Sequence, residues 1–311
     1  MSIRLFDWRD IPALQRYRHQ CVFFYSSLLL TRGPLFFPGA MLSNFSPATG
    51  IVTAVHSKND QAQLLIGQTH HTTGSQSAHL TFLAPEAALE SRALPSLLDY
   101  LAVQMGEQGA FRLIAEVEEG TAFLDILRQQ GFAIYTRQRV WKVAPSDRVI
   151  TSAQWRSAED LDLIGIHSLL RNVAPALVQQ VEPFPTGHLR GMVFRQSGDV
   201  LAYAELKTGR RGVWIQPVFH PAVENQDELL VNLVENLPNR FARPVYLCIR
   251  SYLSWLYPVL DEFGAQASPR QAVMVKNFAI TQKVLRPVAI PALEGGRPEV
   301  STPFARSEKH I

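Results

Sequence analysis

The hydrophobic pattern between residues 111 and 143 predicts a strand, a helix and a second strand. Residues 111–117 form a short apolar run, as a buried strand does. The following segment has apolar residues at 123, 124, 126 and 127 and stops at Gly131, which is typical of a helix end. Residues 132–143 then alternate between apolar and polar positions, as a half-buried strand does.

The same order of elements returns 133 residues later. Residues 245–249 predict a strand, residues 253–263 a helix that stops at Gly264, and residues 265–280 a second strand. At this shift five pairs of residues are identical: Leu127/Leu260, Gly131/Gly264, Arg137/Arg270, Gln138/Gln271 and Val140/Val273. The shared order and the identities together indicate an internal repeat.

The segments that precede residue 111 and residue 245 in the two repeats also correspond. Strands are predicted over residues 63–70 and 200–207, and two more end at Pro85 and Pro221. The strands that end at Pro85 and Pro221 each precede a helix with one apolar stripe. Each half also opens with a helix that begins near an acid, Asp10 in the first half and Glu159 in the second. We therefore expect two α+β domains, over residues 1–144 and 152–281, with a junction at residues 144–147. The proline-rich residues 282–311 predict a flexible tail.

Composition excludes several classes of protein. The 311 residues carry 30 basic and 27 acidic side chains, a net charge of +3 that gives no reason to expect binding to nucleic acid. Cys21 and Cys248 have no metal or redox spacing. No metal site is expected from His70, His71 and His79, because adjacent strand residues point to opposite faces. The apolar run 21–30 is too short to span a membrane, and no signal segment opens the chain, so we expect a cytoplasmic protein.

Residues 78–142 resemble the GNAT superfamily of acyl-CoA-dependent N-acyltransferases, and residues 213–278 resemble a second copy. The segment Phe123–Phe132 is similar to the closing helix of that family, which ends in a Gly-Phe step before the last hairpin. The resemblance implies two GNAT-like domains, each with a mostly antiparallel central sheet flanked by helices. It also implies acetyl-CoA or another acyl-CoA as co-substrate.

The family holds the pantetheine arm of acyl-CoA on the backbone of one strand and the pyrophosphate on a glycine-rich loop. On this chain the strand positions are Leu83 and Ala84, and the loop positions that offer polar groups are Ser91 and Arg92. The sequence departs from the family at this loop, which has no glycine and places Leu89 where the phosphates would approach. In the second half, residues 222–228 contain three acids and no base. Leucine replaces the family's proton-donating tyrosine at 127 and 260.

Three residues are candidates for catalysis. Glu116 and Glu118 lie at the end of the strand that would border the cleft, where a desolvated carboxylate can act as a general base. Tyr252 lies at the corresponding strand end of the second half and is a candidate proton donor. The alternative interpretations are solvent-exposed strand-end carboxylates and a packed tyrosine.

Two functions follow from the resemblance. The first is an acyltransferase that moves an acetyl or other acyl group from acyl-CoA to an amine of a small molecule or protein. The second is a non-catalytic binding or scaffold protein with the same fold, which has lost the loop for the pyrophosphate.

Overall fold

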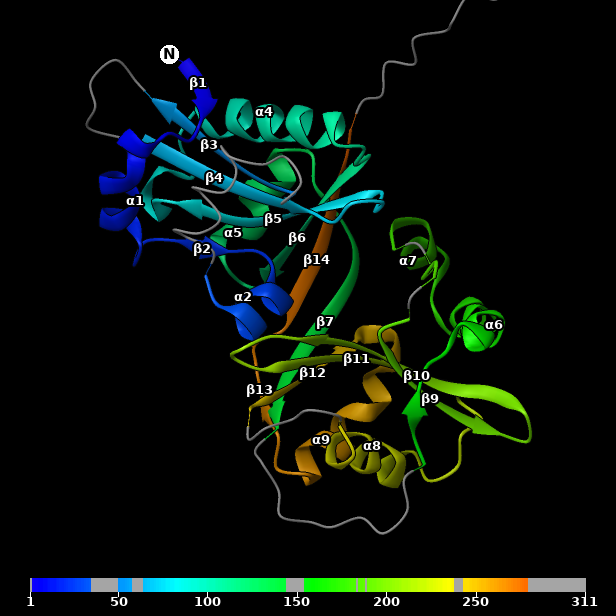
Figure 1. Cartoon of the computed structure of the whole chain (residues 1–311). Helices are drawn as coiled ribbons and strands as arrows, with labels where there is room; N and C mark the ends of the chain where they lie inside the picture. The colour runs from blue at the N-terminus through cyan, green and yellow to red at the C-terminus, as the bar shows by residue number, and fades with distance from the viewer. Residues whose placement is uncertain are drawn as a thin grey trace, which may run out of the picture. The chain divides into compact units, whose positions relative to one another are not determined.

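Two successive sets of the same elements make up the part of the chain that the structure describes (Figure 1). The computed structural model describes residues 2–34, 50–57, 64–143, 154–182, 184–187, 189–237 and 243–278. Residues 1–278 group into one compact unit. The predicted junction at 144–147 and the predicted tail 282–311 lie outside the described residues.

The first set ends with the predicted strand, helix, strand order of residues 111–143. Its strands are β1 Ser2–Leu5, β2 Val22–Phe23, β3 Ile51–Ser57, β4 Leu64–His71, β5 Ser77–Ala84, β6 Arg112–Glu118 and β7 Ala133–Val143. Its helices are α1 Ile11–Tyr17, α2 Ser26–Arg32, α4 Leu94–Glu107 and α5 Ala122–Gln129, with short 3₁₀ turns η1 Trp8–Asp10 and η3 Glu86–Ala88.

The second set repeats this order, except that no strand corresponding to β2 lies between its first two helices. Its strands are β8 Arg156–Ser157, β9 Gly191–Gln196, β10 Asp199–Thr208, β11 Val213–Phe219, β12 Val245–Arg250, β13 Gln266–Ala267 and β14 Gln271–Asn277. Its helices are α6 Leu163–Val173, α7 Ala176–Val181, α8 Gln226–Glu235 and α9 Tyr257–Glu262, with 3₁₀ segments η4 Asp160–Asp162 and η5 Ser251–Leu256. Gly131 and Gly264 both have positive φ, 84° and 73°, just after the helices that they terminate. Glycine is favoured at both helix ends because it has no Cβ to oppose this conformation.

Both halves open with a helix near an acid, as predicted, and in both an acid at this start is paired with an arginine that the sequence analysis did not identify. The guanidinium of Arg4 donates two hydrogen bonds to the carboxylate of Asp10, at 2.6 and 2.7 Å. Arg156 and Asp162 make the same bidentate pair at 2.8 and 2.7 Å. In each half the acid also caps the turn that precedes the first helix. The repeated spacing Arg-x5-Asp is the signal that would have marked both starts.

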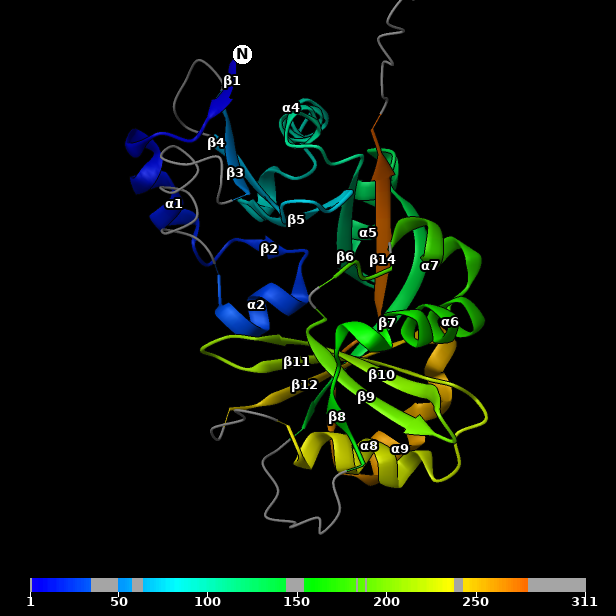
Figure 2. The ribbon, with the colours of Figure 1, turned by 45° about the vertical axis from the view of Figure 1, so that its right-hand side comes forward.

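The strands form one continuous sheet in which the two halves exchange their last strands. The order is β1-β3-β4-β5-β6-β14-β7-β12-β11-β10-β9-β8, with β13 beside β7 and β2 beside β5. Thus β14, from the second half, lies between β6 and β7 of the first half (Figure 2). In return β7 extends between β12 and β13. The pairing is antiparallel except between β5 and β6 and between β11 and β12.

A pseudo-twofold axis passes through the exchanged strands at a pair of glutamines. Gln138 on β7 pairs in register with Gln271 on β14, its own equivalent in the repeat, and their side chains are hydrogen-bonded at 2.8 Å. The register is symmetric about this point: Met274 pairs with Ile134, and the equivalent residues Trp141 and Ala267 also pair. The register thus repeats with the 133-residue shift read from the sequence.

The second helix of each half contacts the sheet of the other half. Helix α2 packs against β10 and β11, and the N–H of Arg211 donates to the carbonyl of Thr31 at 2.9 Å. Helix α7 packs against β7 and joins a buried cluster that includes Ile114 and Val273. Of the apolar region that begins at Cys21, helix α2 therefore packs between the halves.

Candidate functional site

The first candidate cleft lies between β5 and β6. These parallel strands pair only over Ser77–His79 and Arg112–Ile114, after which no further pairs form between them. The other edge of β5 remains paired with β4 as far as Ala84. A wedge-shaped gap therefore opens in the sheet toward the end of β5.

The chain fills this gap with its own backbone. Val22 and Phe23 of β2 pair with Leu83 and Phe82 on the free edge of β5. The N–H of Phe24 donates to the carbonyl of Thr81 at 3.0 Å, and the carbonyl of Phe24 accepts from the N–H of Glu116 on β6 at 2.9 Å. One residue thus bridges both strands.

The filling segment continues to the loop that follows β5. The N–H of Glu86 donates to the carbonyl of Gln20 at 2.8 Å. Phe24 is 1% exposed and meets Phe123 edge-on, with ring centroids 6.5 Å apart. The segment Gln20–Phe24 therefore occupies the gap from the loop to the point where the strands part, and we call it the inserted segment.

The predicted cofactor residues lie around this filled gap. Leu83 and Ala84 are buried, and the free edge of Leu83 pairs with Val22. Ser91 and Arg92 are exposed just before α4. Leu89 is 2% exposed and belongs to the core, so this loop folds inward on an apolar side chain. Binding of acyl-CoA by these four residues stays a prediction.

The second candidate cleft lies between β11 and β12. These strands pair over Val213–Ile215 and Val245–Leu247 and then part. Along β11, the main-chain groups of alternate residues are hydrogen-bonded to β10. The main-chain groups of Pro217 and Phe219 belong to the other set of residues and point toward the gap. No described strand pairs with that edge. Pro217 has no N–H, so the edge lacks one main-chain donor.

The turn after β11 leads into α8. Asn225 takes a left-handed conformation with φ 52° and ψ 47° at the N-cap of this helix. Asparagine tolerates this region better than most residues. Glu224, Asp227 and Glu228 around it are all exposed. These charges suit the helix dipole and oppose a bound phosphate.

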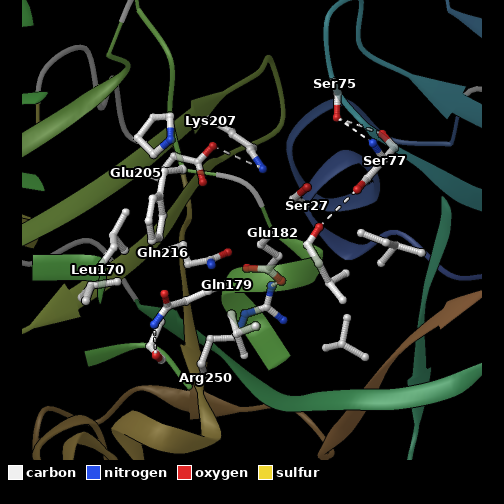
Figure 3. A pocket seen from close by; sticks show the side chains of 18 of the residues that line it. Ser27, Ser75, Ser77, Leu170, Gln179, Glu182, Glu205, Lys207, Gln216 and Arg250 are labelled. Carbon is white, nitrogen blue, oxygen red and sulfur yellow. Dashed lines mark hydrogen bonds and ion pairs between the residues drawn. The ribbon is translucent and has the colours of Figure 1, made fainter. Parts of the chain in front are cut away.

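A cavity of about 390 Å³ lies between the two halves, beside the exchanged strands β7 and β14 (Figure 3). We call it the shared cavity. Its walls come from β5, β6, β7, β10, β11, β12, β14, α2, α6 and α7. One wall is aliphatic and belongs to a single buried cluster, formed by Ile114, Ala174, Val178, Val181 and Val273. The cavity is therefore built jointly by residues that are far apart in the sequence.

The polar groups of the cavity include two ion pairs, both visible in Figure 3. The guanidinium of Arg250, 6% exposed, contacts the carboxylate of Glu182 and donates to Gln138 at 2.7 Å. The hydroxyl of Tyr135 also donates to Glu182, at 2.6 Å. The second pair joins Lys207 and Glu205 at 3.5 Å, with each side chain 41% exposed. The Glu205 carboxylate holds the pKa of Lys207 above its usual value.

The side chains of Gln138 and Gln271 form part of a hydrogen-bonded chain that connects two residues of the cavity lining, Glu116 and Arg250. Gln271 donates to the hydroxyl of Ser26 at 3.0 Å, and the N–H of Ser26 donates to the Glu116 carboxylate at 2.8 Å. Glu116 therefore caps the start of α2, where the helix dipole favours a negative charge. The same chain of bonds reaches Arg250 through Gln138.

The structure brings two of the three predicted catalytic residues together. Glu116 and Tyr252 both line the shared cavity, and burial raises the pKa of the Tyr252 hydroxyl. Glu118 is exposed at the end of β6 and lies outside the cavity lining. A catalytic role for all three stays a prediction.

Sequence reading missed the charged residues Glu182, Glu205, Lys207 and Arg250. Glu205 and Lys207 face the cavity from one strand, and their i, i+2 spacing is a signal for one shared face. Nothing in the local pattern links Glu182 to Arg250, because 68 residues separate them.

The histidines form a cross-strand pair. His70 on β4 pairs with His79 on β5, and Tyr25 stacks on His79 with ring centroids 4.0 Å apart. Burial and the charge of Lys207 lower the pKa of His79, which leaves it neutral at pH 7. Within the described residues no three His, Cys, Asp or Glu side chains are placed to hold a metal ion.

Comparison with known proteins gives matches at the level of structure. No protein-family model matches the sequence, and no curated protein matches it. A GCN5-related N-acetyltransferase from Sphaerobacter thermophilus is similar to this chain with a TM-score of 0.53 at 11% identity, over 89% of this chain and 95% of the other. An acetyltransferase of the GNAT family from Colwellia psychrerythraea gives 0.45 at 11% identity, over 89% and 100%.

A tandem GNAT protein from the clavulanic acid biosynthesis pathway is also similar, with a TM-score of 0.46 at 13% identity, over 90% of this chain and all of that one. No helix in the described part of the chain has the length and apolar character needed to cross a membrane. The match to the Sphaerobacter thermophilus enzyme spans nearly both chains and agrees with the repeated element order and the parting strand pairs. The chain therefore has the GNAT fold, as its sequence resemblance predicted.

Proposed function

We propose that this GNAT-fold protein binds a small polar molecule in the shared cavity and does not hold an acyl donor in its first cleft. The observation that carries the proposal is the inserted segment. Its Phe24 is hydrogen-bonded to β5 on one side and to β6 on the other. This is the gap in which the family's pantetheine arm would lie.

Opening that gap for acyl-CoA is unfavourable. The main-chain bonds of the inserted segment would have to break, and the Phe24 ring would leave a core position that is 1% exposed. Removing a buried phenylalanine side chain costs about 3–5 kcal/mol. The inward-facing Leu89 adds to this, because the loop presents an apolar residue where phosphates would approach.

The shared cavity supports small-molecule binding. Its volume is in the range of ligand pockets, and it combines an aliphatic wall with a few convergent polar groups. Its residues come from both halves, so a ligand there would contact both.

A second candidate is acyl transfer from acyl-CoA held in the second cleft to an amine in the shared cavity. The observation that favours it is the parting of β11 and β12 with no described strand in the gap. Strand β12 and the turn after it carry Arg250 and Tyr252 into the cavity. The acceptor in this candidate is a small-molecule or protein amine, as the sequence resemblance implies.

Calorimetry of the full chain with acetyl-CoA separates the candidates. The proposal expects no binding. If acetyl-CoA binds and Arg92→Ala weakens it about tenfold or more while Arg210→Ala does not, the first cleft holds the donor and the proposal is wrong. Binding that is insensitive to Arg92→Ala supports the second candidate.

A thermal-shift screen tests small-molecule binding. It uses neutral, anionic, cationic and zwitterionic metabolites at millimolar concentration, on the parent chain and on Ala174→Phe. This substitution places a ring on the aliphatic wall. We expect at least one compound to raise the Tm of the parent and not that of a folded Ala174→Phe variant. No stabilising compound in any class would contradict the proposal.

A further inference from the structure

The shared cavity is electrically balanced. Its lining has three carboxylates, on Glu116, Glu182 and Glu205, and three cations, on Arg190, Lys207 and Arg250. His79 adds no charge at pH 7, because its pKa is lowered. A ligand with several negative charges would face three carboxylates at close range. The balance therefore favours a ligand without net charge.

The charged groups differ in how much bonding capacity they have left for a ligand. Glu116 is engaged by the N–H of Ser26, and Glu182 is engaged by Tyr135 and Arg250. The Lys207–Glu205 pair is looser: its separation of 3.5 Å exceeds the 2.7–2.9 Å typical of a charge-assisted hydrogen bond. Both side chains are 41% exposed. This pair retains bonding capacity of both signs toward the cavity.

A ligand that covers this pair has to replace the water around both charges. A neutral ligand would leave the ammonium and the carboxylate partly desolvated, which is unfavourable. A ligand with one ammonium and one carboxylate satisfies both at once, its carboxylate on Lys207 and its ammonium on Glu205. The aliphatic wall then accommodates an apolar side chain.

We propose that the shared cavity recognises a zwitterion of the α-amino acid class with an aliphatic side chain, through Lys207 and Glu205. This inference rests on the proposed function, since it names the ligand class of the same cavity. It assigns Lys207 as the carboxylate-binding group and Glu205 as the ammonium-binding group.

Three matched probes test it by calorimetry at pH 7 and one salt concentration. L-leucine carries both charges, isoamylamine lacks the carboxylate, and 4-methylpentanoate lacks the ammonium. We expect leucine to bind at least tenfold more tightly than either analogue. Equal binding of the three, or binding of neutral sugars in the metabolite screen without leucine, would overturn the inference and leave the proposed function standing. No stabilisation by any class would refute both.

Two variants assign the roles of the charged residues. Lys207→Met should weaken the binding of leucine at least tenfold without weakening the binding of isoamylamine, because isoamylamine has no carboxylate for Lys207 to hold. Glu205→Gln should weaken the binding of leucine without weakening the binding of 4-methylpentanoate, which has no ammonium for Glu205 to hold. Lys276→Met and Glu262→Gln, which change the same residue types outside the cavity lining, are the controls. Leucine affinity that is unaffected by both cavity variants would overturn the assignment.

Discussion

At the scale of single residues, the buried acid Asp162 shows how the second half is held together at its start. Its side chain is 1% exposed and accepts hydrogen bonds from Arg156, Arg195 and the N–H of Glu159. Burial alone would raise the pKa of this carboxyl, but the hydrogen bonds outweigh it and lower the pKa to about 2. The charged form is thus favoured in the folded state.

Asp162→Asn should lower the free energy of unfolding by about 1–3 kcal/mol, because it weakens charge-assisted bonds to two arginines. The pKa in the folded state lies below the ordinary value of 3.8, so the unfolded state binds the proton more readily. The stabilisation is complete above about pH 5, where the unfolded state is also ionised, and it is lost as the pH falls toward the folded-state pKa of about 2. Urea unfolding from pH 7 to pH 3 measures it, with exposed Asp261→Asn as control. A stability difference that is constant over this range would contradict the assignment.

The candidate site was only partly predictable at this scale. Glu116 and Tyr252 were found because each stands at the end of a strand that could be read from its apolar run. The partner of Glu116, the N–H of Ser26, lies 90 residues away, and its bond depends on where the inserted segment packs. Local pattern carries no information on such a contact.

At the scale of elements, the inserted segment is the feature that distinguishes the first half from the second. It gives the first gap a backbone occupant, and the second gap has none among the described strands. Its anchor is the ring of Phe24, which packs in the core beside Phe123.

Phe24→Ala should cost about 3–5 kcal/mol of stability, the usual penalty for removing a buried phenylalanine ring. Phe111→Ala is the control, since that ring is 43% exposed and surface changes cost far less. Chemical unfolding of both variants measures the difference. Equal losses would show that Phe24 does not anchor the segment.

The elements themselves follow from the sequence more closely than their partners do. The predicted strand at 111–117, helix before Gly131 and strand at 132–143 correspond to β6, α5 and β7. The exchange of β7 and β14 was not predicted. An alternating pattern states which face of a strand is buried and leaves open which strand lies beside it.

At the scale of the whole molecule, each core contains residues from the other half. Ala272 and Met274 of β14 belong to the core cluster under α4. Trp141 and Val143 of β7 belong to the core cluster of the second half, where Trp141 is fully buried and lies 4.5 Å from Tyr257 between ring centroids. The repeat is therefore interlocked, and the stability of each half depends on the other.

The fragments 1–149 and 150–311, expressed separately, should each fail to form a stable fold. The first would leave the edge of β6 without β14, and the second would leave the edge of β12 without β7 and its core without Trp141. Open strand edges of this kind promote aggregation. Co-expressed, the fragments should co-purify as a one-to-one complex that unfolds in a single transition. Size-exclusion chromatography and urea unfolding measure this. A fragment that elutes as a folded monomer and unfolds cooperatively by itself would show that residues 1–144 or 152–281 form an independent domain.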